Sequence, residues 1–452
     1  MLSFIKNFFS KNESLVREPQ IIPAALHTLS RDRLSHLCLI VLDTLNAAGF
    51  EAYLVGGSVR DLLLGREPKD FDVATNAKPE EIRRLFKNCR LIGRRFRLAH
   101  IYFKKDIIEV ATFRKEGKEG PHQSKNREGI LKRDNVYGTL EDDVWRRDFT
   151  LNALYYDVKH NHIIDHTQGL DDLKQGIIRI IGKADARYRE DPVRILRAIR
   201  FAAKLGMTLE DHTAQAIAKK RHLLSSIAPS RLADESHKLF SQGNAVNTFT
   251  LLRHHEVLQY LYPLTEKALA HPTLHLATDK FILSALKNTD ARIAENKPIN
   301  PAFLVSVFLW YPLQIQLEKE PPSKEYPDIQ LERVAQMVLS KAKKHLAFTQ
   351  LVTETVLDIW LLQFNLIERK KQRIESLVSH PRFRAAYDFL CLRALIEDNL
   401  GAAADWWTRW QADNEETRHT LMAATASASK PKPRRRRRRS SRKPSEIKIE
   451  AE

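Results

Sequence analysis

The segment between residues 53 and 65 places a strand, a glycine turn and a helix start in succession, and it restricts the fold more than any other part of the chain. Tyr53-Leu54-Val55 has the composition of a buried strand and leads directly into Gly56-Gly57. A helical pattern begins at Ser58 and stops near Gly65. Because glycine lets the backbone approach a ligand closely, the arrangement predicts a phosphate-binding turn at a helix start.

The polar groups of this turn suit a nucleotide. Arg60 supplies positive charge for a triphosphate, and backbone N–H groups at the helix start would add to it. Taken alone, a Gly-Gly pair is an ordinary turn, but an acidic pair follows nine residues after Asp61, and that order favours a functional site. The candidate nucleotide-binding residues of this segment are Gly56, Gly57, Ser58, Arg60 and Asp61.

Asp70-Phe71-Asp72 forms the acidic pair. On a strand expected over 71–74, residues two apart project to one face, so the two carboxylates would lie side by side while Phe71 turns into the core. Their repulsion is costly unless a cation lies between them, and hard oxygen ligands suit Mg²⁺, with Mn²⁺ as an alternative. We therefore expect Asp70 and Asp72 to bind metal, and two such ions could activate an attacking oxygen and steady a leaving one.

A third acid has two candidates. Glu109 lies in an apolar strand expected over 107–113, and Asp148 lies in Arg146-Arg147-Asp148-Phe149-Thr150-Leu151-Asn152. A lone acid in such a strand is usually an edge or ion-pair residue, and Asp148 could pair with the neighbouring arginine. The residues alone do not choose between Glu109 and Asp148.

Asp191 and Arg194 open a helix whose first position is Pro192. The simple interpretation of Asp191 is a helix N-cap. The functional interpretation uses the three-residue spacing, which puts acceptor and donor on one helical face. Adenine and cytosine both present an amino donor beside a ring-nitrogen acceptor, so this pair would select A or C.

The chain of 452 residues is about three times the ~150 residues of a typical domain, so more than one module is expected. Up to about residue 185 strands and helices mix, with a last strand-like pair near 163–164 and 177–181; beyond it the pattern is helical. The residues between 115 and 135 are polar and aperiodic, which predicts a mobile loop. The expected domains are a flexible arm (1–29), an α+β catalytic head (30–185), a helical neck (186–270), a helical body (271–429) and a disordered basic tail (430–452).

The net charge of +18 has two sources. The last 23 residues carry 11 basic and 3 acidic side chains, so about half of the excess belongs to the tail. Nucleic acid is the usual partner of such a surface, although an anionic membrane would also attract it. The three cysteines are scattered, which argues against a disulfide framework. No apolar run approaches 18 residues, which argues against a membrane span, and the absence of a signal peptide favours the cytoplasm.

These motifs resemble those of the class II nucleotidyltransferases, the family of bacterial poly(A) polymerases and tRNA CCA-adding enzymes. The resemblance covers about residues 50–240 and rests on 54–65, 70–72, 146–153 and 190–197. It implies that Asp70 and Asp72 bind catalytic Mg²⁺ and that Gly57 and Arg60 hold the triphosphate. It also implies roles in shaping the nucleotide site or reading the nucleotide for Arg147, Asp148, Asn152, Asp191, Arg194 and Arg197.

The segment Leu91 to His100 resembles the signature that separates the poly(A) polymerase branch from CCA-adding enzymes. Its arginines could contact the primer or form an ordinary solvated face. The segments 300–312 and 380–388 and the arginine-rich tail also resemble that branch. The predicted RNA-binding residues are Arg94, Arg95, Arg97, Arg434, Arg435, Arg436, Arg437, Arg438 and Arg439.

The resemblance implies template-independent transfer of AMP from ATP to RNA 3′ ends, with release of pyrophosphate and a role in RNA decay. A CCA-adding enzyme and a non-catalytic RNA-binding protein on the same fold are the alternatives. A monomer is expected, and ribonuclease E and Hfq are partners that the family alone suggests.

Overall fold

The computed structural model describes residues 18–93, 97–115, 136–321, 327–412, 418 and 421. Most of the loop expected at 115–135, Arg94, Arg95 and the tail at 430–452 lie outside the described residues. The chain divides into two compact units, which are described separately. The first comprises Met1–His271, Leu286–Asn300 and Leu339–Phe348, and the second Pro272–Ala285, Pro301–Val338 and Thr349–Glu452.

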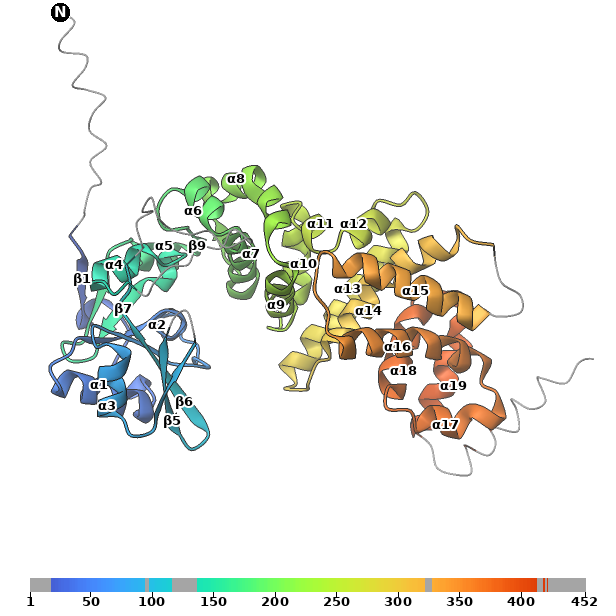
Figure 1. The fold of residues 1–452 in the computed structure, drawn as a ribbon, viewed down its shortest axis with the longest axis horizontal. Coiled ribbons are helices and arrows are strands. Elements are labelled where there is room, and N and C mark those ends of the chain that lie inside the picture. The colour runs from blue at the N-terminus through green and yellow to red at the C-terminus, as the bar shows by residue number, and fades with distance from the viewer. Residues whose placement is uncertain are drawn as a thin grey trace, which may run out of the picture. The chain divides into compact units, whose positions relative to one another are not determined.

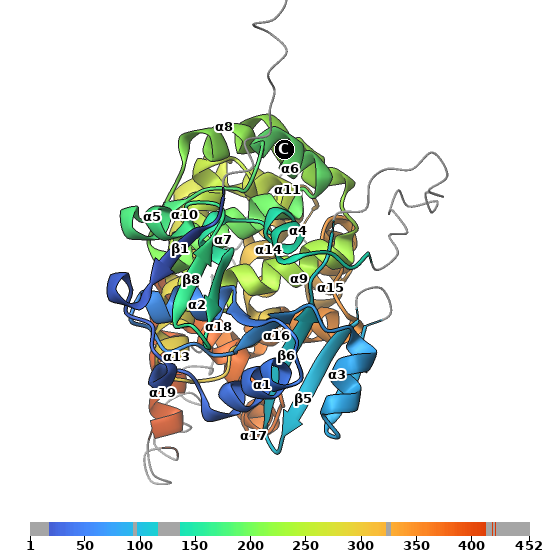
Figure 2. The same cartoon turned by 90° about the vertical axis from the view of Figure 1, so that its left-hand side faces the viewer.

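An eight-stranded sheet forms the head of the first unit (Figures 1 and 2), in the order β1-β8-β7-β2-β3-β6-β5-β4. Strands β3 and β6 are parallel, and every other neighbouring pair in this sheet is antiparallel. The strands are β1 (Gln20–Pro23), β2 (Ala52–Val55), β3 (Asp72–Thr75), β4 (Cys89–Ile92), β5 (Leu98–Phe103), β6 (Asp106–Thr112), β7 (Leu154–Asp157) and β8 (His162–Asp165).

Helices α1 (His36–Ala47) and α3 (Pro79–Leu85) pack on this sheet, α1 against β2, β3 and β6. Helix α1 begins after Ser35, whose side chain accepts a hydrogen bond from the Cys38 N–H and caps the helix. The apolar face, including Val41 and Leu45, is fully buried. Helix α3 begins at Pro79, a favoured position for proline because its fixed φ suits the first helical residue.

Both strand-like segments predicted near 163–164 and 177–181 form strands, β8 and the shorter β9, and the two join different sheets. Strand β8 pairs with β7 and β1, whereas β9 (Ile177–Ile178) pairs in parallel with β10 (Thr208–Leu209). All four residues of β7 are buried, so they show no apolar–polar alternation.

The rest of the first unit is helical. Helix α7 ends at Leu205 and is capped by Gly206, whose φ of 71° is favourable for glycine. Helices α7, α9 and α10 pack against one another. Asp290 accepts hydrogen bonds from the N–H groups of Ala245 and Val246 at the start of α10. The helices are α2 (Gly57–Leu63), α4 (Leu140–Trp145), α5 (Gly169–Gln175), α6 (Ala184–Glu190), α7 (Val193–Leu205), α8 (Asp211–Lys220), α9 (Pro229–Phe240), α10 (Ala245–His254), α11 (Leu258–Leu261) and α12 (Pro263–Leu269).

The described part of the second unit is helical and has an aromatic core. Trp360 and Trp407 are fully buried, and their indole N–H groups donate to the carbonyls of Ser306 (3.2 Å) and Leu366 (2.7 Å). Helix α16 packs against both α14 and α18. Helices contributing to this unit are α13 (His275–Ala294), α14 (Pro301–Leu317), α15 (Pro327–Lys343), α16 (Gln350–Glu368), α17 (Ile374–Val378), α18 (Phe383–Ala394) and α19 (Gly401–Ala412).

The predicted fold class, an α+β head followed by helices, is therefore confirmed for the described residues. Within those residues, every helix is too short or too polar to span a bilayer.

Candidate active site

Three carboxylates gather where β3 begins. Asp72 is the first residue of β3 and pairs in register with Val55 of β2 and Glu109 of β6. Asp70 lies two residues before the strand and is exposed, and Phe71 between them is half-buried rather than in the core as predicted. The short strand explains this difference, because regular alternation begins only at Asp72.

The ionisation of Asp72 reflects these neighbours. Burial raises its pKa to about 6, with a further increase from Glu109 and a smaller one from Asp70, against the opposing effect of Arg147. A half-buried carboxylate beside two others is stabilised by a cation, and a set of carboxylate oxygens suits a hard divalent ion. The residues present thus fit the divalent metal that the sequence predicts.

Gly56 lies between the carboxylate of Asp72 and the guanidinium of Arg147. Its φ of 73° and ψ of −132° are accessible to glycine but strained for other residues. A Cβ atom at this position would lie 3.5 Å from Nη1 of Arg147 and 3.9 Å from Oδ2 of Asp72. The absence of a side chain therefore leaves room beside both charged groups.

Arg60 is buried, with 3% of its surface exposed, and it already has partners in the protein. Its Nε donates to Asp61 (2.8 Å) and its Nη1 to Oδ1 of Asn152 (2.7 Å). The Ser58 hydroxyl is also buried and donates to the Val55 carbonyl (2.9 Å). These side chains hold the turn together, and a direct contact with a triphosphate remains a prediction.

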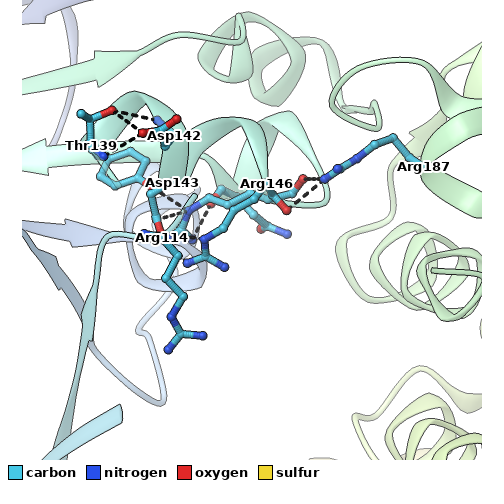
Figure 3. Close-up of polar contacts among 9 residues, drawn as sticks. Arg114, Thr139, Asp142, Asp143, Arg146 and Arg187 are labelled. Carbon is cyan, nitrogen blue, oxygen red and sulfur yellow. Dashed lines mark hydrogen bonds and ion pairs between the residues drawn. The ribbon is translucent and has the colours of Figure 1, made fainter. Parts of the chain in front are cut away.

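Asp143 organises the arginines beside this turn (Figure 3), and the sequence reasoning missed it. Thr139 caps α4, since its hydroxyl accepts from the Asp142 N–H (3.2 Å). Asp143 is 1% exposed and accepts from Arg146 Nε (2.8 Å) and Arg147 Nη2 (3.1 Å). Its spacing of three and four residues from the two arginines was the available signal.

The charges of this cluster support one another. Burial opposes ionisation of Asp143, but Arg147 and Arg146 outweigh it and hold the pKa of Asp143 below its usual range. Burial likewise opposes charge on Arg147, yet Tyr155 and Asp143 raise the pKa of Arg147.

Arg187 of α6 holds the backbone of this cluster, and the sequence did not predict it. It donates through Nη2 to the carbonyls of Arg146 (2.9 Å) and Arg147 (2.7 Å; Figure 3). Arg147 is therefore a permanent cation fixed near Asp72.

A cavity of about 300 Å³ lies between this cluster and the helices that follow. Its volume is at the lower end of the range for small-molecule sites. Five arginines and three acids line it, a net positive charge that suits an anionic ligand. The lining residues are Arg146, Arg147, Asp148, Asp191, Val193, Arg194, Arg197, Arg231 and Glu235.

Asp148 has a different environment from Glu109. Its carboxylate accepts from Arg197 Nε (2.7 Å), the Phe149 N–H (2.9 Å) and Asn152 Nδ2 (3.4 Å). Burial alone would raise the pKa of Asp148, but Arg197 lowers it. The geometry thus places Glu109 beside Asp72 and Asp148 in an ion pair that lines the cavity.

Asp191 and Arg194 both line the cavity, and the Arg194 N–H donates to the Asp191 carbonyl (3.0 Å), but their side chains have different partners. Asp191 accepts from Arg231 Nη2 (2.7 Å) and from the Val193 N–H (3.2 Å). The predicted cap position is wrong by one residue, because α7 begins at Val193 and its N-cap is Pro192. Arg194 Nη1 donates to Oε2 of Glu190 (2.8 Å). Each member of the predicted base-reading pair therefore has its own charged partner.

Arg231 and Glu235 of α9 are cavity residues that the sequence reasoning did not find. Glu235 is 6% exposed, and its Oε1 accepts from Lys238 (2.9 Å). Within the described residues, its Oε2 makes no hydrogen bond and has an ion pair of 4.0 Å with Arg200. No local motif in the sequence connects α9 with Asp191, 40 residues earlier.

Of the predicted RNA-binding residues, Arg97 alone lies within the described chain. It is exposed and pairs with Glu80 at 2.6 Å. His100, in the same sequence segment, lies opposite Glu109, with Nε2 3.4 Å from Oε2 of the acid. Arg94, Arg95 and Arg434–Arg439 are outside the described residues, so their roles stay predictions.

The fold is that of the tRNA nucleotidyltransferases. A structure described as "CCA-adding enzyme apo form II" has a TM-score of 0.60 at 20% identity, over 87% of this chain and 93% of that one. Three family models also match: "Poly A polymerase head domain" at 52–179, "Probable RNA and SrmB- binding site of polymerase A" at 206–269, and "Polymerase A arginine-rich C-terminus" at 323–443.

Sequence comparison distinguishes the two branches. Poly(A) polymerase I of Salmonella typhi is 46% identical over 413 residues, covering 89% of this chain and 88% of the relative. The CCA-adding enzyme of Lactobacillus johnsonii is 44% identical over 201 residues, covering only 44% of this chain and 49% of that enzyme. The chain belongs to the bacterial poly(A) polymerase family, which confirms the predicted enzyme class, a polynucleotide adenylyltransferase.

Proposed function

We propose that this protein transfers AMP from ATP to RNA 3′ ends without a template and releases pyrophosphate. The observation that carries the proposal is the register pairing of Asp72 with Glu109 beside Gly56 and the arginine-lined cavity. Family membership supports the choice of ATP and RNA over other nucleotidyl-transfer substrates.

Asp70, Asp72 and Glu109 would hold Mg²⁺, or Mn²⁺ in its place. When bound, the metal lowers the pKa of the RNA 3′-hydroxyl and balances the negative charge on the phosphates. Arg147, fixed by Asp143, contributes a second positive charge near the triphosphate. Gly56 and Gly57 leave space for the phosphates, while Arg60 positions the turn through Asp61 and Asn152.

Asp191 and Arg194 would read the base by exchanging partners. Asp191 leaves Arg231 to accept the adenine amino group, and Arg194 leaves Glu190 to donate to a ring nitrogen. A hydrogen-bond pattern shared by adenine and cytosine does not by itself exclude CTP. We therefore assign the rejection of CTP to the shape of the cavity around Arg197 and Glu235.

The basic surface would hold the RNA. Arg97 and the arginines at 94, 95 and 434–439 supply phosphate contacts that carry little sequence information. We place the protein in the cytoplasm as a monomer that marks RNA for decay. Interactions with ribonuclease E and Hfq follow from the family resemblance only.

Separate assays with each nucleoside triphosphate and a non-tRNA primer test the proposal. We expect a long ladder with ATP alone, lost in Asp72→Asn and retained in Asp106→Asn, a matched exposed acid on β6. Addition that stops after C-C-A, and only on tRNA, would instead establish the CCA-adding alternative. No incorporation by the folded wild type with Mg²⁺ or Mn²⁺ would favour an RNA-binding protein.

A further inference from the structure

We propose that Asp157, His160 and His162 form a second metal-binding site, specific for a transition-metal ion such as Zn²⁺ or Ni²⁺. One ligand atom from each residue lies within 4.8 Å of the other two. Two imidazoles and one carboxylate make a donor set of the kind that these ions prefer. The site is independent of the proposed catalytic function.

A tight hairpin fixes the three residues relative to one another. Asp157 ends β7, His162 begins β8, and the two are directly opposite in the antiparallel pair. Asn161 in the connecting turn has a φ of 52°, and its Oδ1 accepts from the Tyr156 hydroxyl at 2.6 Å. This hydrogen bond ties the turn to β7, which lowers the conformational cost of bringing the ligands together.

The two oxygens of Asp157 have separate roles. Oδ1 accepts from the backbone N–H groups of Lys159 (2.8 Å) and His160 (3.2 Å). Oδ2 faces the imidazoles, 2.8 Å from His160 Nδ1 and 3.7 Å from His162 Nε2. Such hydrogen bonds on the non-ligating oxygen orient a metal-binding carboxylate.

The separations of Asp157 Oδ2 from the two imidazole nitrogens suit one small ion. Ligands about 2.0–2.2 Å from a tetrahedral zinc ion are roughly 3.4 Å apart. The Asp157–His162 pair is close to this value, and the Asp157–His160 hydrogen bond has to open by about 0.6 Å. The His160 and His162 rings lie nearly parallel, with an angle of 16° between them. His160 is 58% exposed, which gives the ion and a water ligand access.

This site differs from the catalytic carboxylates in chemistry and in place. Asp70, Asp72 and Glu109 offer oxygen only, which favours Mg²⁺. Val55 pairs with both Asp72 and Tyr155, and Asp157 lies two residues further along β7, toward the other end of the strands. His162 also pairs with Pro23 of β1, so an ion here would clamp the edge of the sheet.

Calorimetric titration of tag-free, full-length protein with Zn²⁺ and with Ni²⁺ tests the site. An Asp72→Asn background removes competing binding at the catalytic carboxylates. We expect one bound ion, with a Kd that His160→Gln raises more than about 100-fold, since loss of an outer-shell partner alone typically costs 10–100-fold. His222→Gln, at an exposed histidine of another element, should bind like the background protein.

Thermal denaturation provides a second readout. Saturating Zn²⁺ should raise the Tm of the background protein but not that of His160→Gln, and the two should have equal Tm values in EDTA. Equal affinity in the two proteins, an equal loss in His222→Gln, or no binding by the folded background protein would overturn the proposal. His160→Gln is preferred to His162→Gln because His160 is the more exposed of the two.

Discussion

Carboxylates have opposite electrostatic environments in two regions of the first unit. One region is the carboxylate edge at Asp70, Asp72 and Glu109, and the other is the cavity lined by Asp148 and Asp191. At the edge, acids lie beside acids, and the pKa of Asp72 rises to about 6. In the cavity, Arg197 pairs with Asp148 and Arg231 with Asp191. A carboxylate whose strongest charged neighbour is another acid marks where a cation would bind, and carboxylates paired with arginines mark where a polar ligand would exchange partners with the protein.

Removing Asp72 from the carboxylate edge should lower activity while it raises stability. Asp72→Asn should lower the rate of primer extension about 10³-fold, because a metal contributes several kcal/mol to catalysis. Its free energy of unfolding should rise by about 2–3 kcal/mol at pH 7, since the pKa of Asp72 is raised from 3.8 to about 6 and such an acid destabilises the fold once it ionises. Initial rates and urea denaturation measure the two effects, with Asp106→Asn as control. Loss of both activity and stability would contradict a metal role for Asp72.

Asp148→Asn should have the opposite effect on stability. It leaves Arg197 without its carboxylate, and we expect a loss of roughly 1–2 kcal/mol, discounted because Arg197 is 36% exposed. A double-mutant cycle with Arg197→Gln, followed by urea denaturation, isolates the pair. Additive losses would show that the ion pair contributes no coupling energy.

The pH dependence of metal affinity should report the raised pKa of Asp72. Protons compete with the metal below about pH 6, so Mg²⁺ affinity should fall about tenfold for each pH unit below that value and stay level above it. Glu109→Gln removes the second-largest cause of the raised pKa of Asp72, so the fall in metal affinity should then begin at a lower pH. Binding of Mn²⁺, followed by electron paramagnetic resonance, measures this independently of activity. A transition that stays at the same pH would exclude coupling between the two acids.

The sequence predicted the parts of this comparison that depend on local order. The strand, the glycine turn and the acidic pair lie within 20 residues, and local spacing was enough to locate Asp70 and Asp72. The choice between Glu109 and Asp148 was out of reach, because the β3–β6 register brings together residues 37 apart. Arg187 and Arg231 were missed for the same reason, since each meets its partner from a helix about 40 residues away.

Arg231 gives the smallest effect and the sharpest test of partner exchange. Arg231→Gln leaves Asp191 without its cation, so the carboxylate is free to accept from the base but is held less firmly. We expect a KM for ATP changed by only about two- to fivefold, because Arg231 is 52% exposed and its ion pair with Asp191 is solvated. The ratio of ATP to CTP use should stay unchanged, because adenine and cytosine offer Asp191 the same amino donor. Steady-state kinetics with both nucleotides measure this, with Arg189→Gln, an exposed arginine of α6, as control. An unchanged KM would mean that Asp191 reads the base without releasing Arg231, and a changed ratio of ATP to CTP use would contradict the assignment of CTP rejection to the cavity around Arg197 and Glu235.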